Sequence, residues 1–291
     1  MKAAVIGGSG FIGSEIASIL RERGHDVIVA DRMGSGTTYC DVTDIETLQF
    51  LDGVDEVYNL AGVLGTTELE TQIYEAVKVN ILGATNVFEA CNRYKVKRLF
   101  YPSKPNVWRN VYTITKEASE ELAQKYNESY FTNICSLRLF NVFGPRQKLI
   151  PVRKIVPIFA AQAILKLPIQ VWGDGQQTVD LIYSKDIAKI IVDFCGLGTT
   201  EFLDLGRGIA LTVLNIANIV NKYYNNPSGV QHLPMRAGET PNTLLVADIK
   251  RLSSMIDLHF TDFDLAMDET LSYYATMPKN QLESGIHFYG I

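Results

Sequence analysis

The sequence predicts an α/β protein built on a doubly wound parallel sheet, with a smaller, mixed domain toward the C-terminus. Short apolar runs alternate with helical segments up to about residue 140, a pattern typical of parallel strands covered by helices on both faces. A glycine-rich turn directly follows the first apolar run. Beyond residue 141 the alternation becomes irregular, which indicates that a second kind of domain begins there.

The glycine-rich turn predicts a dinucleotide site. Residues 2–6 form a short apolar run without helical period, and a segment with one apolar face follows the turn as far as about Gly24. Strand, glycine turn and helix together are the fingerprint of a Rossmann domain, in which the helix N-terminus binds a pyrophosphate. A side chain at Gly7 or Gly10 would hold the pyrophosphate away from the backbone, and Gly13 lets the helix pack close to the sheet. The expected contacts are Gly7, Gly10, Phe11, Ile12 and Gly13.

The next predicted strand, residues 26–30, is followed by Asp31, which bears on the choice of dinucleotide. A carboxylate at this place accepts both ribose hydroxyls and repels a 2′-phosphate, which favours NAD. Arg32 beside it can hold that phosphate, so NADP remains the alternative.

Composition limits the other classes of function. The 291 residues are 47% hydrophobic, and the net charge of −5 comes without a basic cluster, which argues against a nucleic-acid partner. The four cysteines stand far apart without metal or disulfide spacing, so we expect buried thiols, no metal site and a reducing compartment. The first strand begins at residue 2 and the longest apolar run, 155–165, is short for a bilayer, so we expect a cytoplasmic protein without a membrane partner.

The remaining elements are expected as follows. Further strands are predicted at 37–40, 55–60, 98–101, 133–140 and 202–205, with helices at 45–52, 69–94, 112–126, 188–194 and 212–223. Residues 141–147 are expected to form a turn, and the tail 279–291 has no clear period. We assign residues 1–141 plus about 179–206 to the dinucleotide domain, and about 142–178 plus 207–278 to the second domain.

A tyrosine and a lysine mark the helix that follows the 98–101 strand. Tyr112 and Lys116 are four residues apart, so they share one helical face. Tyr74 and Lys78 have the same spacing, but they lie in the middle of a long helix. Tyr112 starts its helix just after a strand, on the side where the dinucleotide must lie, so Tyr112 and Lys116 are the preferred pair.

Taken together, these motifs resemble those of the extended short-chain dehydrogenase/reductase family, specifically its nucleotide-sugar epimerases and dehydratases. The resemblance runs from residue 3 to about 277. The matching segments are GGSGFIG at 7–13, Asp41-Val42, Asn59-Leu60-Ala61-Gly62, Asn80 with Gly83-Ala84-Thr85-Asn86, the Tyr112 and Lys116 pair, and the segments 138–146, 173–180 and 236–239.

The resemblance implies an NAD-dependent enzyme that acts on a nucleotide-diphosphate sugar. Tyr112 would take a hydroxyl proton while hydride leaves the sugar carbon, with Lys116 lowering the pKa of the phenol from about 10. An epimerase would return the hydride to the opposite face of a transient 4-keto sugar. Further cofactor contacts implied are Asp41, Val42, Leu60, Ala61, Gly62, Asn80, Tyr112 and Lys116.

The same resemblance implies substrate contacts and a homodimer. Asn141 and Arg236 would hold the diphosphate and Glu239 would reach the nucleoside, and the further expected contacts are Lys104, Lys154 and Val156. The helices at 69–94 and 110–126 would pair across the dimer interface, and the first carries an apolar stripe of Ile73, Val77 and Ile81.

Three departures from the family pattern bear on the chemistry. The position of the family's serine or threonine donor is Lys104, and Ser103 lies one place earlier, so both are candidates for the donor and Ser103 is our expected catalytic residue. Only residues 109–111 separate Trp108 from Tyr112, which removes a loop that usually flanks the sugar. The usual arginine after the threonine of the 173–180 segment is Val179, and Lys154 and Arg153 are the candidates to replace it.

The same region separates the possible reactions. Family 4,6-dehydratases place an acidic pair after the donor, where this chain has Pro105 and Asn106. This favours a 4-epimerase, with a 4-ketosugar reductase or an unusual dehydratase as alternatives. A non-catalytic NAD-binding sensor is the alternative of a different class.

Overall fold

The computed structural model describes residues 1–105, 108–235 and 243–291, and the chain divides into two compact units. The first comprises Met1–Leu139, Lys185–Leu205 and Ile249–Leu258, and the second comprises Phe140–Ser184, Gly206–Asp248 and His259–Ile291. The boundaries differ from the expected ones. Residues 249–258 belong to the first unit and the tail 279–291 to the second. The second unit also includes residues 140–141 and 179–184, which the sequence assigned to the dinucleotide domain.

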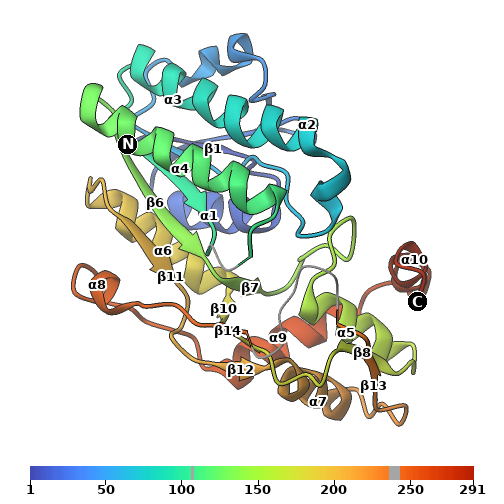
Figure 1. Cartoon of the computed structure of the whole chain (residues 1–291). Coiled ribbons are helices and arrows are strands. Elements are labelled where there is room, and N and C mark those ends of the chain that lie inside the picture. The colour runs from blue at the N-terminus through green and yellow to red at the C-terminus, as the bar shows by residue number, and fades with distance from the viewer. Residues whose placement is uncertain (106–107, 236–242) are drawn as a thin grey trace. The chain divides into compact units, whose positions relative to one another are not determined.

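The first unit is organised by a seven-stranded parallel sheet with strand order β11-β6-β5-β4-β1-β2-β3 (Figure 1). The strands are β1 Lys2–Ile6, β2 Asp26–Asp31, β3 Thr38–Tyr39, β4 Glu56–Asn59, β5 Arg98–Ser103, β6 Asn133–Leu139 and β11 Phe202–Leu205. The chain first builds outward from β1 through β2 and β3, and then from β4 on the other side. This confirms the doubly wound fold, and the strand order reverses where β1 meets β4, the position at which such folds bind ligands.

Helices cover both faces of this sheet (Figure 1). One face carries α1, Phe11–Glu22, and α6, Ser184–Gly196, which are linked by a 2.7 Å ion pair between Arg23 and Asp193. The other carries α3, Ala84–Arg93, and α4, Val111–Ser129. The expected helix at 45–52 is a 3-10 helix, η1, at Ile45–Leu51, with the Asp44 carboxylate accepting from the Glu46 N–H. A short helix, α8, spans Lys250–Ser253.

The long helix expected at about 69–94 is present from Ile73 to Arg93, but its middle is wound as a π-helix and its first turn is separate. The segment consists of a 3-10 turn η2, Glu68–Thr71, a short α2, Ile73–Ala76, a π-helix η3, Val77–Gly83, and then α3. At the end of η3, a Cβ on Gly83 would lie 2.7 Å from Cγ2 of Val42, so the glycine permits a close approach. Apolar residues continue through the whole segment, and for this reason their period does not reveal the change of helix type.

In its described residues, the second unit contains short strands and four helices. Strand β7, Asn141–Phe143, pairs with β10, Leu181–Tyr183. Strand β9, Thr178–Val179, lies between β12, Leu211–Thr212, and β14, Leu244–Leu245. Strand β8, Ile169–Trp172, pairs with β13, Val230–Leu233. The helices are α5 Ile155–Ile164, α7 Val213–Tyr223, α9 Phe263–Ala275 and α10 Lys279–Phe288. The turn expected at 141–147 is therefore wrong at its start, because β7 finds a partner about forty residues away that no local pattern reveals.

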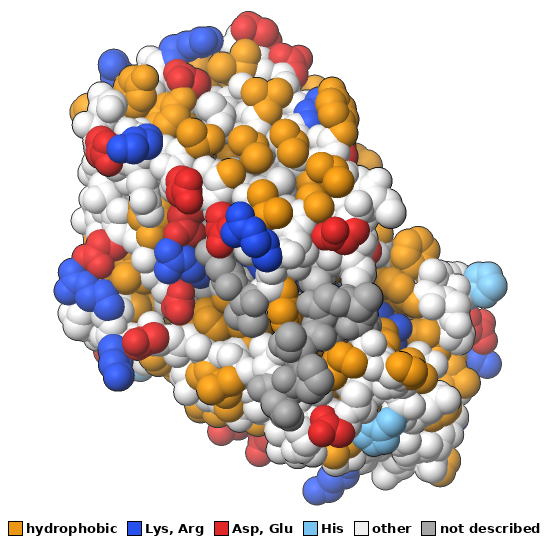
Figure 2. Space-filling model, viewed as in Figure 1, with side chains coloured by type: hydrophobic (Ala, Val, Ile, Leu, Met, Phe, Trp, Pro, Cys, Tyr) orange, Lys and Arg blue, Asp and Glu red, His pale blue; other side chains and the backbone are white. Residues whose placement is uncertain are grey.

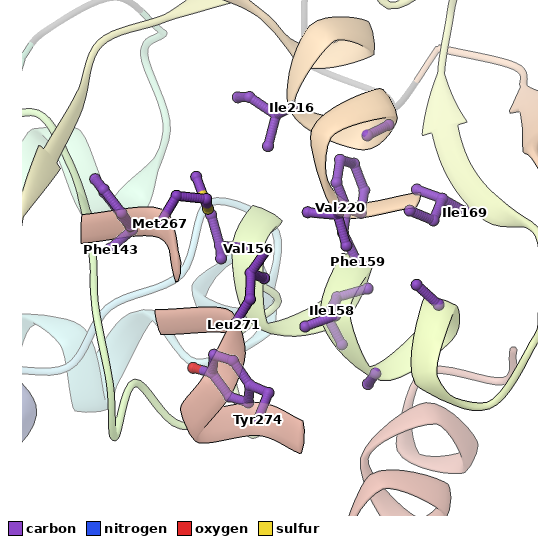
Figure 3. Packing of buried hydrophobic residues seen from close by; sticks show 14 of the residues in the cluster. Phe143, Val156, Ile158, Phe159, Ile169, Ile216, Val220, Met267, Leu271 and Tyr274 are labelled. Atoms are coloured by element: carbon purple, nitrogen blue, oxygen red, sulfur yellow. The ribbon is translucent and has the colours of Figure 1, made fainter. Parts of the chain in front are cut away.

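The tail also has a regular structure that its sequence did not indicate. It forms α10, and Leu282 and Ile286 are buried in the core of the second unit. Figure 3 shows that core, where Phe143, Val156 and Leu271 are among the labelled side chains. All four cysteines are buried and free, as expected. In the described parts of the chain, no helix combines the length and apolar character needed to cross a bilayer.

Candidate active site

In the glycine turn after β1, the backbone lies so close to other backbone atoms that no side chain would fit there. Gly7 has φ of +74°, and a Cβ there would lie 2.9 Å from both the Ala61 nitrogen and the Leu60 carbonyl carbon. A Cβ on Gly13 would lie 2.3 Å from the Gly7 oxygen. Gly10 is the N-cap of α1 and presents no side chain to the first turn, which begins with Phe11 and Ile12. An uncapped helix start next to bare backbone fits a pyrophosphate, so these residues fit a dinucleotide.

Acidic groups lie at the carboxyl ends of β2 and β3. Asp31 accepts hydrogen bonds from the hydroxyl and the backbone N–H of Ser9, which belongs to the glycine turn. The Arg32 guanidinium lies 4.0 Å from the Asp41 carboxylate. The structure thus brings Asp31 to the glycine turn, where a ribose would lie, and places the Arg32 guanidinium near Asp41. Val42 follows, and its carbonyl accepts from the Asn86 amide at 2.9 Å.

The segment after β4 contains Leu60, Ala61 and Gly62 and is attached to the π-helix. Asn80 on η3 is 2% exposed, and its amide hydrogen bonds to the backbone of Val63 and to the hydroxyl of Thr115. A Cβ on Gly62 would lie 3.2 Å from the Asn80 side-chain oxygen. Asn80, predicted as a cofactor contact, thus uses its side chain to hold protein segments together.

Tyr112 and Lys116 occupy the first turns of α4. The helix begins where the Asn110 side chain accepts from the Thr113 N–H at 2.9 Å, which satisfies an otherwise unpaired helix N–H. Lys116 is 6% exposed, and its Nζ lies 3.9 Å from the centroid of the Tyr101 ring. Burial raises the pKa of Tyr112 to about 12 and lowers the pKa of Lys116 to about 7. Each charge is costly here, so an ionised phenol requires cations nearby.

The end of β5 contributes the two donor candidates. The Ser103 hydroxyl is buried and, among the described residues, has no hydrogen-bond partner. The amine of Lys104 donates to Thr113 Oγ1 at 2.6 Å and to the Pro105 carbonyl at 2.8 Å. It also lies 5.6 Å from the centroid of the Tyr112 ring, and burial lowers its pKa to about 8. The structure thus brings Lys104 to the tyrosine predicted as the base.

A further ion-pair network was not predicted from the sequence. Glu120 lies one turn after Lys116 on α4, is buried, and forms a two-point ion pair with Arg138 on β6. Arg138 also lies 3.6 Å from the carboxylate of Asp204 on β11. The four-residue spacing of Tyr112, Lys116 and Glu120 was the signal available in the sequence.

The substrate contacts predicted in the second unit have different surroundings. Asn141 begins β7, and its amide nitrogen is buried without a partner within the described ranges. Lys154 is the N-cap residue of α5. Val156 is 2% exposed and packs in the core, which leaves its side chain no free surface for a ligand. Arg236 and Glu239 lie outside the described residues.

Comparison with known proteins is consistent with this geometry. The family model described as "NAD dependent epimerase/dehydratase family" matches residues 3–195. The chain is 26% identical over 282 residues to a putative UDP-glucose 4-epimerase of Methanocaldococcus jannaschii, covering 86% of this chain and 91% of that protein. It is 27% identical over 270 residues to UDP-glucuronic acid decarboxylase 1 of Arabidopsis thaliana, covering 82% of this chain but only 62% of that protein.

A solved structure of similar fold is the UDP-glucose 4-epimerase of Thermotoga maritima with UDP-glucose. The TM-score is 0.88 at 22% identity, covering 94% of this chain and 98% of that one. The family model covers about two thirds of the chain, and its first segment is the glycine turn described above. The chain therefore belongs to the NAD dependent epimerase/dehydratase family and is an NAD-dependent enzyme.

Proposed function

We propose that this protein is a nucleotide-sugar 4-epimerase that acts through a transient 4-keto sugar. The observation that carries the proposal is the position of Tyr112. The tyrosine lies in the first turn of a helix that follows β5, it has Lys116 one turn away, and it has the Lys104 amine against its ring. Because β1, β4 and β5 are parallel, this helix begins at the edge of the sheet that carries the glycine turn.

In this reaction, side chains of the protein transfer one proton to and from the sugar hydroxyl. NAD, held at the glycine turn and Asp31, would supply the hydride acceptor and donor for the sugar carbon. Tyr112 as phenolate takes the proton of the sugar hydroxyl and gives it back once the sugar has turned over. The buried Ser103 hydroxyl supports a role as hydrogen-bond donor to the same sugar oxygen.

The energetic demand on Tyr112 is large. A phenol whose pKa is raised to about 12 by burial must be ionised near neutral pH. Lowering the pKa from that value to about 8 corresponds to roughly 5 kcal/mol of stabilisation of the phenolate. Burial also lowers the pKa of Lys116 to about 7, so it disfavours the charge that this lysine would supply. A further cation beside the ring is therefore useful for this reaction.

The alternatives differ in their products. Pro105 stands in a place where 4,6-dehydratases have an acid, which disfavours that reaction. The relative named UDP-glucuronic acid decarboxylase 1 makes decarboxylation of a uronic acid a further alternative.

The test is incubation with NAD and a panel of UDP-, dTDP- and GDP-sugars, followed by product analysis by NMR. A 4-epimerase gives the same mixture of two C4 epimers from either one, without net reduction of NAD. Release of carbon dioxide from a uronic acid, or a 4-keto-6-deoxy product, would overturn the proposal in favour of the matching alternative. NAD binding without any product across the panel would favour the sensor.

We further propose that the nucleotide-sugar contacts include Asn141 and Lys154 of the second unit. The buried, unpartnered amide nitrogen of Asn141 supports this, because such a group costs free energy unless a ligand or water accepts from it. Asn141→Ala should then raise KM more than it lowers kcat. A change confined to kcat would exclude a ground-state contact.

We also propose a homodimer. Exposed apolar side chains gather over α2, η3 and α4, where Figure 2 shows hydrophobic atoms close together. They include Ile73, Val77, Leu82 and Ile114. Burying such a surface against a second copy removes it from water. Light scattering should give twice the chain mass, and Val77→Asp should give a monomer. A monomeric wild-type protein at micromolar concentration would exclude the dimer.

A further inference from the structure

Lys104 is held in one place by two hydrogen bonds to neutral oxygens. Its Nζ donates to Thr113 Oγ1 at 2.6 Å and to the Pro105 carbonyl at 2.8 Å. The Thr113 hydroxyl donates its own proton to the Trp108 carbonyl at 2.7 Å, so its oxygen is oriented to accept from the amine. Both acceptors are uncharged, and hydrogen bonding therefore fixes the amine without neutralising it.

The amine so fixed faces the ring of Tyr112. The distance from Nζ to the ring centroid is 5.6 Å, within the range of a cation–π contact. A cation at this distance attracts the neutral ring weakly but attracts a phenolate strongly, because the full negative charge then lies on that ring and its oxygen. The contact is therefore stronger in the ionised state of Tyr112 than in the neutral state.

We propose that Lys104 is a positioning residue of this site, whose ammonium group, held by Thr113 and Pro105, stabilises the phenolate form of Tyr112. The inference rests on the proposed function in taking Tyr112 as the base. It gives Lys104 a role different from that of a hydroxyl donor to the sugar, and it leaves that task to Ser103.

Burial acts on both lysines near Tyr112. It lowers the pKa of Lys104 to about 8 and that of Lys116 to about 7. Lys104 differs from Lys116 in its contacts, because its amine is held on two neutral oxygens and lies against the Tyr112 ring. Among the described residues, the other charged or titratable groups near these lysines and Tyr112 include Tyr101 on β5, Glu117 and Glu120 on α4, Arg109 paired with Glu117, and Glu70 of η2, which accepts from the Val111 N–H.

The test measures the ionisation of Tyr112 in the NAD-loaded full chain by two readouts. Ultraviolet difference titration against Tyr112→Phe isolates the phenolate of this tyrosine and needs no turnover. The acid limb of the pH profile of kcat/KM reports the same group during catalysis. We expect Lys104→Met to raise the pKa of Tyr112 by about one unit in both readouts. Activity on the acid limb should then fall about tenfold, and the loss should diminish as the pH rises.

Companion variants separate charge from structure. Lys104→Arg should restore the wild-type values, Lys104→Gln should behave as Lys104→Met, and Thr113→Val should shift the pKa less than either neutral variant. Lys125→Met removes an exposed charge from the same helix and should change nothing. Equal shifts in Lys104→Met and Lys104→Arg, or no shift in Lys104→Met and Lys104→Gln, would overturn the proposal. The titration measures the effect of Lys104 on the pKa of Tyr112 even if no sugar is turned over. Failure of the epimerase assignment can therefore be told apart from failure of the Lys104 proposal.

Discussion

The carboxamide of Asn80 pairs with the backbone of Val63 in both directions. The Val63 N–H donates to Asn80 Oδ1 at 2.9 Å, and Asn80 Nδ2 donates to the Val63 carbonyl at 2.9 Å. The same nitrogen lies 3.1 Å from the Thr115 hydroxyl, and the Asn80 carbonyl accepts from the Ser119 hydroxyl at 2.6 Å. One residue of the π-helix therefore joins the segment after β4 to the helix that carries Tyr112.

We expect Asn80→Ala to lower the free energy of unfolding by about 2 kcal/mol, because it leaves the Val63 N–H and C=O without their partners. Turnover should fall as well, since α4 loses a contact one turn from Tyr112. Urea unfolding and steady-state rates measure the two effects. Asn92→Ala on α3 is the control and should be close to neutral. Comparable losses in both variants would exclude a special role for Asn80.

Gly13→Ala tests how closely the glycine turn is packed. The new Cβ would lie 2.3 Å from the Gly7 oxygen and 2.9 Å from Gly8 Cα, both of them backbone atoms that cannot move aside cheaply. We expect a loss of about 2 kcal/mol in stability and a fall of more than tenfold in NAD affinity. Gly196→Ala at the end of α6 meets no atom within 4 Å and should be neutral or slightly stabilising. Calorimetric titration with NAD would refute the packing argument if both variants bound equally well.

The two tyrosine–lysine pairs can be separated by single-atom changes. Tyr112→Phe removes the oxygen that takes the proton and should abolish turnover while NAD binding survives. Tyr74 is 81% exposed, so Tyr74→Phe should leave the rate almost unchanged. Activity assays together with NAD titrations measure both properties. Similar rate losses in the two variants would mean that the wrong pair has been taken as catalytic.

Lys116 should make stability depend on pH in a defined direction. Its pKa of about 7 in the folded protein lies below the 10.5 of the unfolded chain, so between these values the unfolded chain binds more protons. Stability from this group is therefore fully present at high pH and is lost as the pH falls to about 7. Lys116→Met removes the cost and should stabilise the protein by up to about 4 kcal/mol at neutral pH.

The measurement is urea unfolding of wild type and Lys116→Met at neutral and at alkaline pH. The stabilisation should be largest at neutral pH and should shrink toward about pH 10. Lys125→Met, which removes an exposed lysine paired with Glu128, should show no such dependence. A stabilisation that is the same at both pH values would contradict the assigned pKa.

Local sequence determined much of the first unit. The glycine spacing at residues 7–13 predicts the turn because backbone contacts there exclude side chains, and the alternation of short apolar runs with helices predicts the parallel sheet. Tyr112 and Lys116 were chosen as candidates by their spacing and by their place after a strand, and both lie at the start of α4. These features depend on residues close together in the chain, so they can be predicted from the sequence alone.

Tertiary structure decided the remaining features, because each of them depends on contacts between residues far apart in the sequence. The sequence predicts Asn80 as a cofactor contact, and only the fold shows that its amide also joins Val63 to Thr115. Strand β7 exists because β10 lies beside it, and α10 forms where Leu282 and Ile286 find an apolar core. Lys104 shows the difference most clearly. The sequence placed a lysine at a donor position, but only the fold set its amine on the neutral oxygens of Thr113 and Pro105 and against the ring of Tyr112.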